Sequence, residues 1–282
     1  ISRLVDNLGS ELELAWQGQV SDLVTALACS PNGRGWAASS AAGEVVWNLG
    51  LGELVRLHEA DGQSISEVAF SADGRWLAAG GQAGKLLIWN CDDPNLPPQL
   101  VQTLNIDKWI EHLVWHPSQP ELAISYGTHV KIWEAIAQTE ITTWKFDKSS
   151  VFDLAWHPAG SVLAVAGYKG VQIWSPRDPT APPSSLAVDT ASINIAWAGD
   201  GRYLAAGNLD RTLTIMDWQQ PEESWTLQGC PGKIRRLAWI AGTVTPCLAV
   251  ASGMTIVLWE LSTDTTTWNG RLCEGHQAIV AT

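Results

Sequence analysis

Apolar and polar positions follow one recurring pattern along most of the chain. A unit begins with an alternating apolar stretch and continues through a short polar turn into a stretch of apolar and small residues. After a glycine-containing turn it ends in an apolar run closed by tryptophan. The most regular copy is FSADGRWLAAGGQAGKLLIWN, residues 70–90. Such short apolar runs between turn signals are typical of β-strands, so the pattern predicts three strands per unit.

The unit occurs six times. Its closing residues are Trp47, Trp89, Trp133, Trp174, Met216 and Trp259. Their successive separations are 42, 44, 41, 42 and 43 residues, and a more polar stretch after each one predicts a fourth strand. Units of this kind cannot bury their faces alone. We therefore expect four-stranded antiparallel sheets packed side by side, with tryptophan filling the wedge between neighbours.

A period near 42 residues, turns such as SPNG and SADG, and a third strand that ends in tryptophan resemble WD40 repeats. The resemblance covers nearly the whole chain and implies a β-propeller. The chain departs from the family pattern at several positions. The Gly-His pair survives only at Gly275-His276, the aspartate of the second tight turn only at Asp210, and the aspartate after the closing residue only at Asp217. The internal hydrogen-bond network of the family is therefore expected to be mostly missing, and tryptophan packing to replace it.

The two ends of the chain bear on the number of blades. Residues 1–21 resemble the third and fourth strands of a further blade, with Val5 in the tryptophan column, and residues 276–282 resemble the start of its first strand. We expect a single all-β domain, a seven-bladed β-propeller of four-stranded antiparallel blades, with an incomplete closing blade shared by both termini. Six blades are the alternative. The six repeats are expected at residues 22–61, 62–107, 108–148, 149–190, 191–231 and 232–275.

Composition limits the classes of partner. The 282-residue chain carries 17 Lys and Arg against 29 Asp and Glu, a formal net charge of −12. Nucleic-acid binding requires clustered basic side chains, so we expect no nucleic-acid partner and no membrane partner. No apolar run approaches the ~18 residues of a membrane-spanning helix. Five cysteines at irregular spacing argue against a disulfide framework and favour a reducing, cytoplasmic location.

The sequence lacks recognisable catalytic and metal-binding motifs. His116 and His157 occupy matching WHP turns in consecutive repeats. A zinc site would need three or four convergent ligands, so turn formation is the preferred interpretation of both. The glycine-rich AAGGQAG, residues 78–84, has no lysine pattern and no following helix, and it predicts a turn rather than a phosphate-binding loop. We expect no enzyme activity, no metal and no small-molecule cofactor.

Candidate partner-binding residues follow from strand alternation. Residues directly before and after the first buried position of each inner strand share a face opposite to the core. In a propeller they line the rim of the upper face around the central channel, where WD40 proteins commonly bind partners. The aromatic Trp109 and Phe152 are typical interface anchors, and Lys233 and Arg235 could bind a carboxylate. The predicted partner-binding residues are Ser66, Trp109, Glu111, Ser150, Phe152, Asn194, Lys233 and Arg235.

These observations favour a non-enzymatic WD40 scaffold that binds a protein or peptide on its upper rim within a multiprotein complex. The style of the repeats resembles bacterial members of the family. The alternative is a propeller enzyme or small-ligand binder that uses the central channel. That alternative requires three or more His or carboxylate groups at one point of the channel, whereas the predicted rim offers few titratable groups. Two proline-rich segments, residues 91–99 and 175–185, are expected to protect outer edges, with docking as their alternative function.

Overall fold

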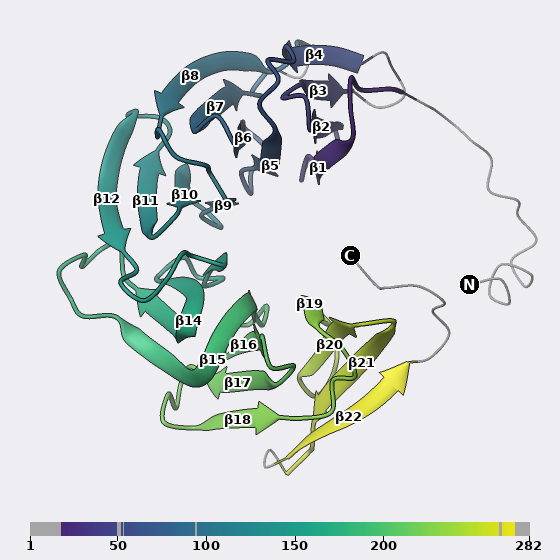
Figure 1. The fold of residues 1–282 in the computed structure, drawn as a ribbon, viewed down its shortest axis with the longest axis vertical. Coiled ribbons are helices and arrows are strands. Elements are labelled where there is room, and N and C mark those ends of the chain that lie inside the picture. The colour runs from purple at the N-terminus through teal and green to yellow at the C-terminus, as the bar shows by residue number, and fades with distance from the viewer. Residues whose placement is uncertain (1–17, 50–51, 53, 94, 265–266, 274–282) are drawn as a thin grey trace, which may run out of the picture.

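The computed structural model describes residues 18–49, 52, 54–93, 95–264 and 267–273. Every regular element in these ranges is a β-strand, and the strands form antiparallel sheets arranged around a common centre (Figure 1). This confirms the predicted all-β propeller architecture. The residues expected to build the third and first strands of a closing blade, 1–17 and 276–282, lie outside the described ranges. Seven blades therefore stay a prediction.

Six blades are present in the described part of the chain, and four of them are separate four-stranded sheets. Blade 1 contains β1 (Val24–Cys29), β2 (Trp36–Ser40), β3 (Val45–Asn48) and β4 (Leu54–His58). Blade 2 contains β5 (Ile65–Phe70), β6 (Trp76–Gly81), β7 (Lys85–Asn90) and β8 (Gln99–Asn105). Blade 3 contains β9 (His112–Trp115), β10 (Glu121–Tyr126), β11 (His129–Glu134) and β12 (Thr139–Lys145). Blade 6 contains β19 (Ile234–Trp239), β20 (Cys247–Ser252), β21 (Thr255–Leu261) and β22 (Trp268–Cys273).

Blades 4 and 5 are joined into one six-stranded sheet. Its strands are β13 (Asp153–Trp156), β14 (Leu163–Trp174), β15 (Ser184–Trp197), β16 (Tyr203–Asn208), β17 (Leu213–Asp217) and β18 (Ser224–Leu227). Two long strands cause the fusion. By comparison with the other repeats, β14 carries the second and third strands of blade 4 through a turn at Lys169 and Gly170, which both have positive φ. Strand β15 then serves as the outer strand of blade 4 and the inner strand of blade 5.

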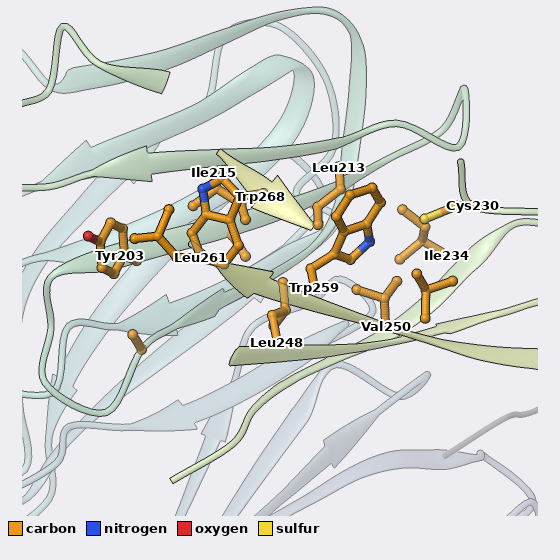
Figure 2. Close-up of a cluster of buried hydrophobic side chains, with 13 residues drawn as sticks. Tyr203, Leu213, Ile215, Cys230, Ile234, Leu248, Val250, Trp259, Leu261 and Trp268 are labelled. Atoms are coloured by element: carbon orange, nitrogen blue, oxygen red, sulfur yellow. The ribbon is translucent and has the colours of Figure 1, made fainter. Parts of the chain in front are cut away.

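Each blade is an antiparallel meander whose first strand lies nearest the centre and whose fourth lies outermost (Figure 1). The inner strands β1, β5, β9, β13, β15 and β19 contact one another in that order. An apolar cluster fills each of the five interfaces between consecutive described blades. Figure 2 shows the one between blades 5 and 6, where Leu213 and Ile215 meet Leu248, Val250 and Trp259. The predicted core between blades is confirmed.

Small residues on the second strand let consecutive blades approach closely. A Cβ atom added at Gly207 would lie 2.6 Å from Ile234 of the next blade, and one at Gly80 would lie 3.0 Å from Ile110. Both isoleucines are fully buried. The glycine and alanine positions of this strand are therefore set by the first apolar residue of the following blade, which packs directly on the backbone.

Tryptophans at the ends of inner strands add a directional bond between blades. The indole N–H of Trp156 donates to the carbonyl of Val114 at 3.0 Å, and that of Trp197 donates to Ala155 at 3.1 Å. Trp115 and Trp239 make the same bond to Ala69 and Ala196. Each acceptor lies on the inner strand of the preceding blade. The rings thus supply both buried apolar area and a fixed attachment to the neighbouring blade.

The two WHP histidines make a second set of bonds between blades. His116 Nε2 donates to the Gly160 carbonyl at 2.9 Å, while Nδ1 accepts from the backbone N–H groups of Ser118 and Gln119. His157 repeats the pattern, with its Nε2 3.0 Å from the Gly201 carbonyl. Both ring nitrogens are therefore used within the fold, in agreement with the turn-forming interpretation.

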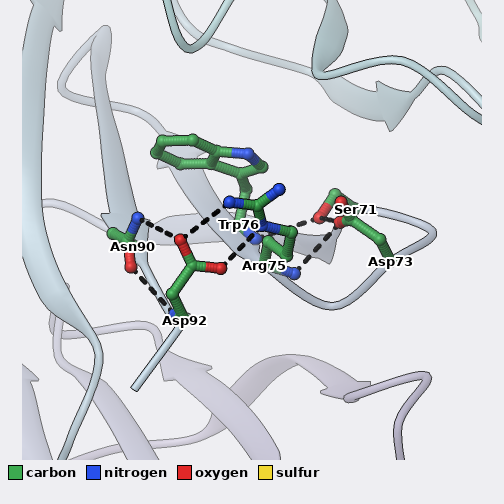
Figure 3. A network of polar contacts seen from close by, with 6 residues as sticks. All are labelled: Ser71, Asp73, Arg75, Trp76, Asn90 and Asp92. Carbon is green, nitrogen blue, oxygen red and sulfur yellow. Dashed lines mark hydrogen bonds and ion pairs between the residues drawn. The ribbon is translucent and has the colours of Figure 1, made fainter.

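Polar contacts fix the SADGRW turn between the first and second strands of blade 2 (Figure 3). Ser71 Oγ donates to Asp73 Oδ1 at 2.6 Å and accepts from the Trp76 N–H at 2.9 Å. The Arg75 guanidinium binds both oxygens of Asp92, at 2.6 and 3.1 Å, and lowers the pKa of that carboxyl. Arg75 thereby ties the first turn of the blade to the proline-rich segment after its third strand.

We expect Trp156→Phe to lower the free energy of unfolding by about 2 kcal/mol, because it removes an indole bond between blades and part of a buried ring. The matched control is Trp218→Phe, which changes a half-buried indole whose N–H is bonded to no described residue and should cost less than about 1 kcal/mol. Urea denaturation followed by circular dichroism measures both. Equal losses in the two variants would contradict a special contribution of the indole bond.

Candidate functional site

The direction of the strands defines two faces of the propeller. In an antiparallel meander the segment that enters the first strand and the turn between the second and third strands lie on the same face, here called the upper face. The turns after the first and third strands lie on the lower face. Residues 106–111 and 147–152 enter the inner strands of blades 3 and 4, and residues 167–170 form the upper turn of blade 4.

Among the described residues, the exposed aromatic side chains all lie on the upper face. Trp109, Phe152 and Tyr168 are 52%, 39% and 47% exposed, while the closing tryptophans of the blades lie between sheets. Phe152 and Tyr168 both belong to blade 4, where the Phe152 N–H donates to the carbonyl of Ala166. Lys169 Nζ lies 5.4 Å from the centre of the Tyr168 ring. The sequence analysis missed Tyr168, although the alignment of the repeats places it in an upper turn.

Strand bulges set the positions of the other rim residues. Ser66 and Arg235 are the extra residues where the pairing of β5 with β6 and of β19 with β20 shifts by one. In blade 5 the shifted residue is Ile193, so Asn194 lies one position deeper than its predicted equivalents, at the level of Glu67. The buried Ser192 takes the place of the first apolar residue and donates to Asn208. A bulge adds one residue to a strand and redirects its side chain. The rim prediction assumed strict alternation along each strand and therefore missed this change.

The structure brings only some of the predicted rim residues together. The Trp109 indole N–H donates to Ser66 Oγ of blade 2 at 3.2 Å, which turns the ring toward the blade that precedes it. Glu111 accepts from the Gly127 N–H at 2.9 Å and thereby holds the upper turn of its own blade. Ser150, Lys233 and Arg235 are exposed, and no contact joins their side chains to the two rim aromatics. Trp109 with Ser66 is thus the one predicted cluster that the geometry supports.

One level below the rim, a second set of side chains occupies equivalent inner-strand positions. We call them the channel ring: Glu67, His112, Asp153, Asn194 and Arg236. Each lies three residues before the aromatic residue that ends its strand, and the inner strands surround the centre of the propeller (Figure 1). Blade 1 has Ala26 at the same level.

Members of the channel ring reach toward the next blade. Glu67 Oε1 lies 3.8 Å from His112 Nδ1, and His112 is hydrogen-bonded to the Phe152 backbone. Asp153 Oδ2 accepts the Ile195 N–H at 2.8 Å, while its Oδ1 accepts the Leu154 N–H. The buried Asn194 Oδ1 has no hydrogen-bond partner among the described residues. Arg236 forms no ion pair with any residue that the structure describes.

Burial controls the ionisation of these groups. Desolvation and, next, the charge of Asp153 raise the pKa of Glu67 to about 7, although Arg236 opposes them. Desolvation raises the pKa of Asp153 to about 6, against the effect of its two backbone hydrogen bonds and of Arg236. Desolvation lowers the pKa of His112. At neutral pH the ring therefore holds two carboxyl groups that would be more stable in an ionised state if a cation lay beside them.

Few titratable side chains were expected around the channel, and the structure places three of them there with an arginine. The signal is present in the repeat alignment, as the column EHDNR at residues 67, 112, 153, 194 and 236. The predicted rim residues end one position before this column. Within the described residues, no group of three or more His, Cys, Asp and Glu side chains is arranged to hold a metal ion. Nor does that part of the chain hold any helix with the length and apolar character needed to cross a membrane.

Two segments of the chain match the WD40 family model, described as WD domain, G-beta repeat: residues 52–90 and 138–175. Each match begins before the outer strand of one blade and ends after the third strand of the next. Two curated relatives bear the name small ribosomal subunit protein RACK1. The one from Drosophila melanogaster is 26% identical over 62% of this chain and 43% of its own length. The one from Caenorhabditis elegans is 27% identical over 69% and 50%.

The chain thus spans about half the length of the curated relatives it matches. Both relatives are animal proteins, so they lend no support to the bacterial likeness suggested by the repeats. Among solved structures, one of the mitotic checkpoint complex matches with a TM-score of 0.72 at 18% identity, over 97% of this chain and 90% of the other. The RRP9 WD40 repeats match with a TM-score of 0.67 at 16% identity, over 90% and 81%. These similarities show the fold.

We expect Glu67→Gln to raise the melting temperature at pH 8 and to leave it nearly unchanged at pH 5. The folded-state pKa of Glu67, about 7, lies above its ordinary value of 4.5, so the wild-type protein loses stability as the pH rises between the two. Glutamine removes this loss, which amounts to at most about 3 kcal/mol.

Glu140→Gln is the matched control. Lys131 lowers the pKa of Glu140, so its replacement should give no gain in stability at pH 8. Thermal denaturation of both variants and the wild type across pH 5–8 measures the difference. A Glu67→Gln effect that is the same at both ends of this range would rule out burial of an ionisable carboxyl.

Proposed function

We propose that this chain, which carries WD40 repeats folded as a β-propeller, is a non-enzymatic platform that binds a protein or peptide on its upper face. The observation that carries the proposal is the distribution of exposed aromatic side chains. Trp109, Phe152 and Tyr168 all lie on the upper face, on two consecutive blades. Aromatic residues are enriched in protein interfaces and supply much of their binding energy.

The predicted rim residues take different parts in this proposal. Trp109, oriented by its bond to Ser66, and Phe152 are the apolar anchors, with Tyr168 beside them. The exposed Lys233 and Arg235 on blade 6 supply positive charge for an acidic group of the partner. Glu111 holds an upper turn, Ser150 is exposed on the segment that leads to Phe152, and Asn194 lies below the rim in the channel ring. The names of the relatives and neighbours, a small ribosomal subunit protein and a part of the mitotic checkpoint complex, support a partner that is itself part of a multiprotein assembly.

Charge and composition support the remaining features of the proposal. The net charge of −12 disfavours nucleic acid as the main partner. All five cysteines are unpaired, as a reducing cytoplasmic location would require. The alternative function is the binding of a small ligand in the channel. The channel ring is a specific observation in favour of that alternative. Its Glu67 and His112 lie 3.8 Å apart and Asp153 already accepts two backbone bonds, so binding fits the ring better than acid–base catalysis.

We expect the double variant Trp109→Ala, Arg235→Ala to lose a partner that the wild-type protein retains in affinity purification with mass spectrometry. Truncation of an aromatic hot-spot residue costs 2 kcal/mol or more, about a 30-fold loss in affinity. The matched control is Arg34→Ala with Ile136→Ala, which removes one exposed cation and one exposed apolar side chain from the lower face. Partners that disappear only with the control pair would place the binding surface on the lower face.

A further inference from the structure

The channel ring lies directly beneath the aromatic part of the proposed platform. Ser66 accepts the Trp109 indole N–H, and the next residue along β5 is Glu67, whose carboxylate approaches His112 of blade 3. The indole and the first carboxylate are therefore supported by the same strand. A side chain that entered the channel from the upper face would pass Trp109 before it reached Glu67.

We propose that the channel ring binds one cationic side chain, an arginine or a lysine, that the partner inserts from the upper face. The inference rests on the proposed function, because it assigns the chemistry of the partner at the same surface. Its basis is the pair of carboxylates that Glu67 and Asp153 place on the inner strands, together with the Trp109 ring that is bonded to the residue directly before Glu67.

The carboxylates have free capacity to accept hydrogen bonds. The nearest titratable neighbour of Glu67 is His112 at 3.8 Å, a separation too long for a strong hydrogen bond, and the Glu67 side chain is 32% exposed. Each oxygen of Asp153 accepts one backbone N–H, which fixes its orientation and leaves further lone pairs available. A guanidinium carries five donors in a planar fork, and an ammonium carries three. Either group fits acceptors that are already held in place.

Asn194 supplies a separate observation. Its Oδ1 atom is buried and accepts no hydrogen bond from the described residues. A buried acceptor without a donor costs free energy, and such groups are rare in native structures. It occupies the ring position directly after Asp153, between blades 4 and 6. The Oδ1 atom is covered by protein 3.6 Å from the Cβ position of Gly207, so a ligand donor satisfies it only if the side chain turns toward the centre.

The charges that act on Glu67 favour a cation over an anion. They come from Asp153 and Arg236, because burial lowers the pKa of the adjacent His112 and favours its neutral form. The strands packed on β5 add no charge there, since Gly80 of β6 pairs with Glu67, and Thr25 of β1 bonds to the Ile65 carbonyl. Arg236 lowers the pKa of both carboxyls without forming an ion pair in the described structure. An anion in the ring would face two carboxylates, whereas a cation would face them together with one distant guanidinium.

Ionisation provides a signature of this binding. Because the pKa of Glu67 is raised to about 7, part of the unliganded population is protonated at neutral pH. A bound cation stabilises the ionised carboxylate, so binding releases protons and becomes tighter as the pH rises from 6 to 8. A cation held only at an exposed, permanently ionised carboxylate would show neither effect.

The test uses N-acetyl-arginine N-methylamide as the probe and the neutral citrulline analogue as its isostere, titrated into the protein at pH 6 and pH 8. Isothermal titration calorimetry in buffers of different ionisation enthalpy, with amide chemical shifts in nuclear magnetic resonance, measures affinity and proton release. We expect saturable binding of the arginine probe, at least tenfold weaker binding of citrulline, and tighter binding at pH 8. Loss of one charge-assisted hydrogen bond corresponds to a factor of about 10 to 100, so Glu67→Gln should weaken binding by that amount.

Asp147→Asn is the matched control, since it removes an exposed carboxylate of the upper face outside the ring and should leave the affinity unchanged. Three results would each overturn the proposal: no saturable binding, equal binding of citrulline, or equal affinity in Glu67→Gln and the wild type.

Capture of the cellular partner separates this inference from the proposed function. If Trp109→Ala with Arg235→Ala abolishes capture while Glu67→Gln with Asp153→Asn does not, the platform stands and the cation site fails. If the arginine probe binds but neither double variant affects capture, the proposed platform is rejected and the cation site stands.

Discussion

The packing of each inner strand against the blade before it is the constraint on which the rest of the structure depends. An indole N–H bonds each of four consecutive blades to the carbonyl of its predecessor, for example Trp156 to Val114 at 3.0 Å. An apolar contact could slide along the neighbouring sheet, but a hydrogen bond to one carbonyl fixes the register between blades. Because the acceptors lie on inner strands, the same bonds fix the positions of the residues that face the centre.

This arrangement explains why the polar residues of the channel ring are so strongly perturbed. Consecutive blades approach closely through contacts such as Ile234 on Gly207, and the inner-strand side chains of Glu67 and Asp153 are only partly exposed. These two carboxyls have few partners to stabilise their charge, and their pKa values rise to about 7 and 6. The pKa of Asp92 shifts in the opposite direction because that carboxyl is paired with Arg75 (Figure 3). The hydrogen-bond and charge partners of a carboxyl, not its residue type, decide the direction of the shift.

Most of the fold could be predicted from the sequence, because the same strand pattern recurs six times with a period of about 42 residues. Trp109 was also found, since alternation alone places it outside the core. The channel ring was not found, because convergence of residues 42 positions apart depends on the ring that the blades form together. Asn194 was placed one level too high for a local reason: a bulge at Ile193 shifts the register of β15. Tyr168 was visible in the alignment but lay in a turn that the rim analysis did not include.

The channel ring is not needed to build the blades. Blade 1 has Ala26 at the same level and forms the same four-stranded sheet, so a small apolar residue is compatible with the fold. Glu67 and Asp153 instead reduce stability above the range in which unfolded carboxyls titrate, because folding takes them out of water. Asp153 bonds the inner strand of blade 5 through the Ile195 N–H, whereas Glu67 costs stability without a hydrogen bond to a described residue, which is typical of groups that act on another molecule. A cation in the ring would stabilise the ionised Glu67 and offset this cost, and this connects the inner strands to the face where the exposed aromatic residues lie.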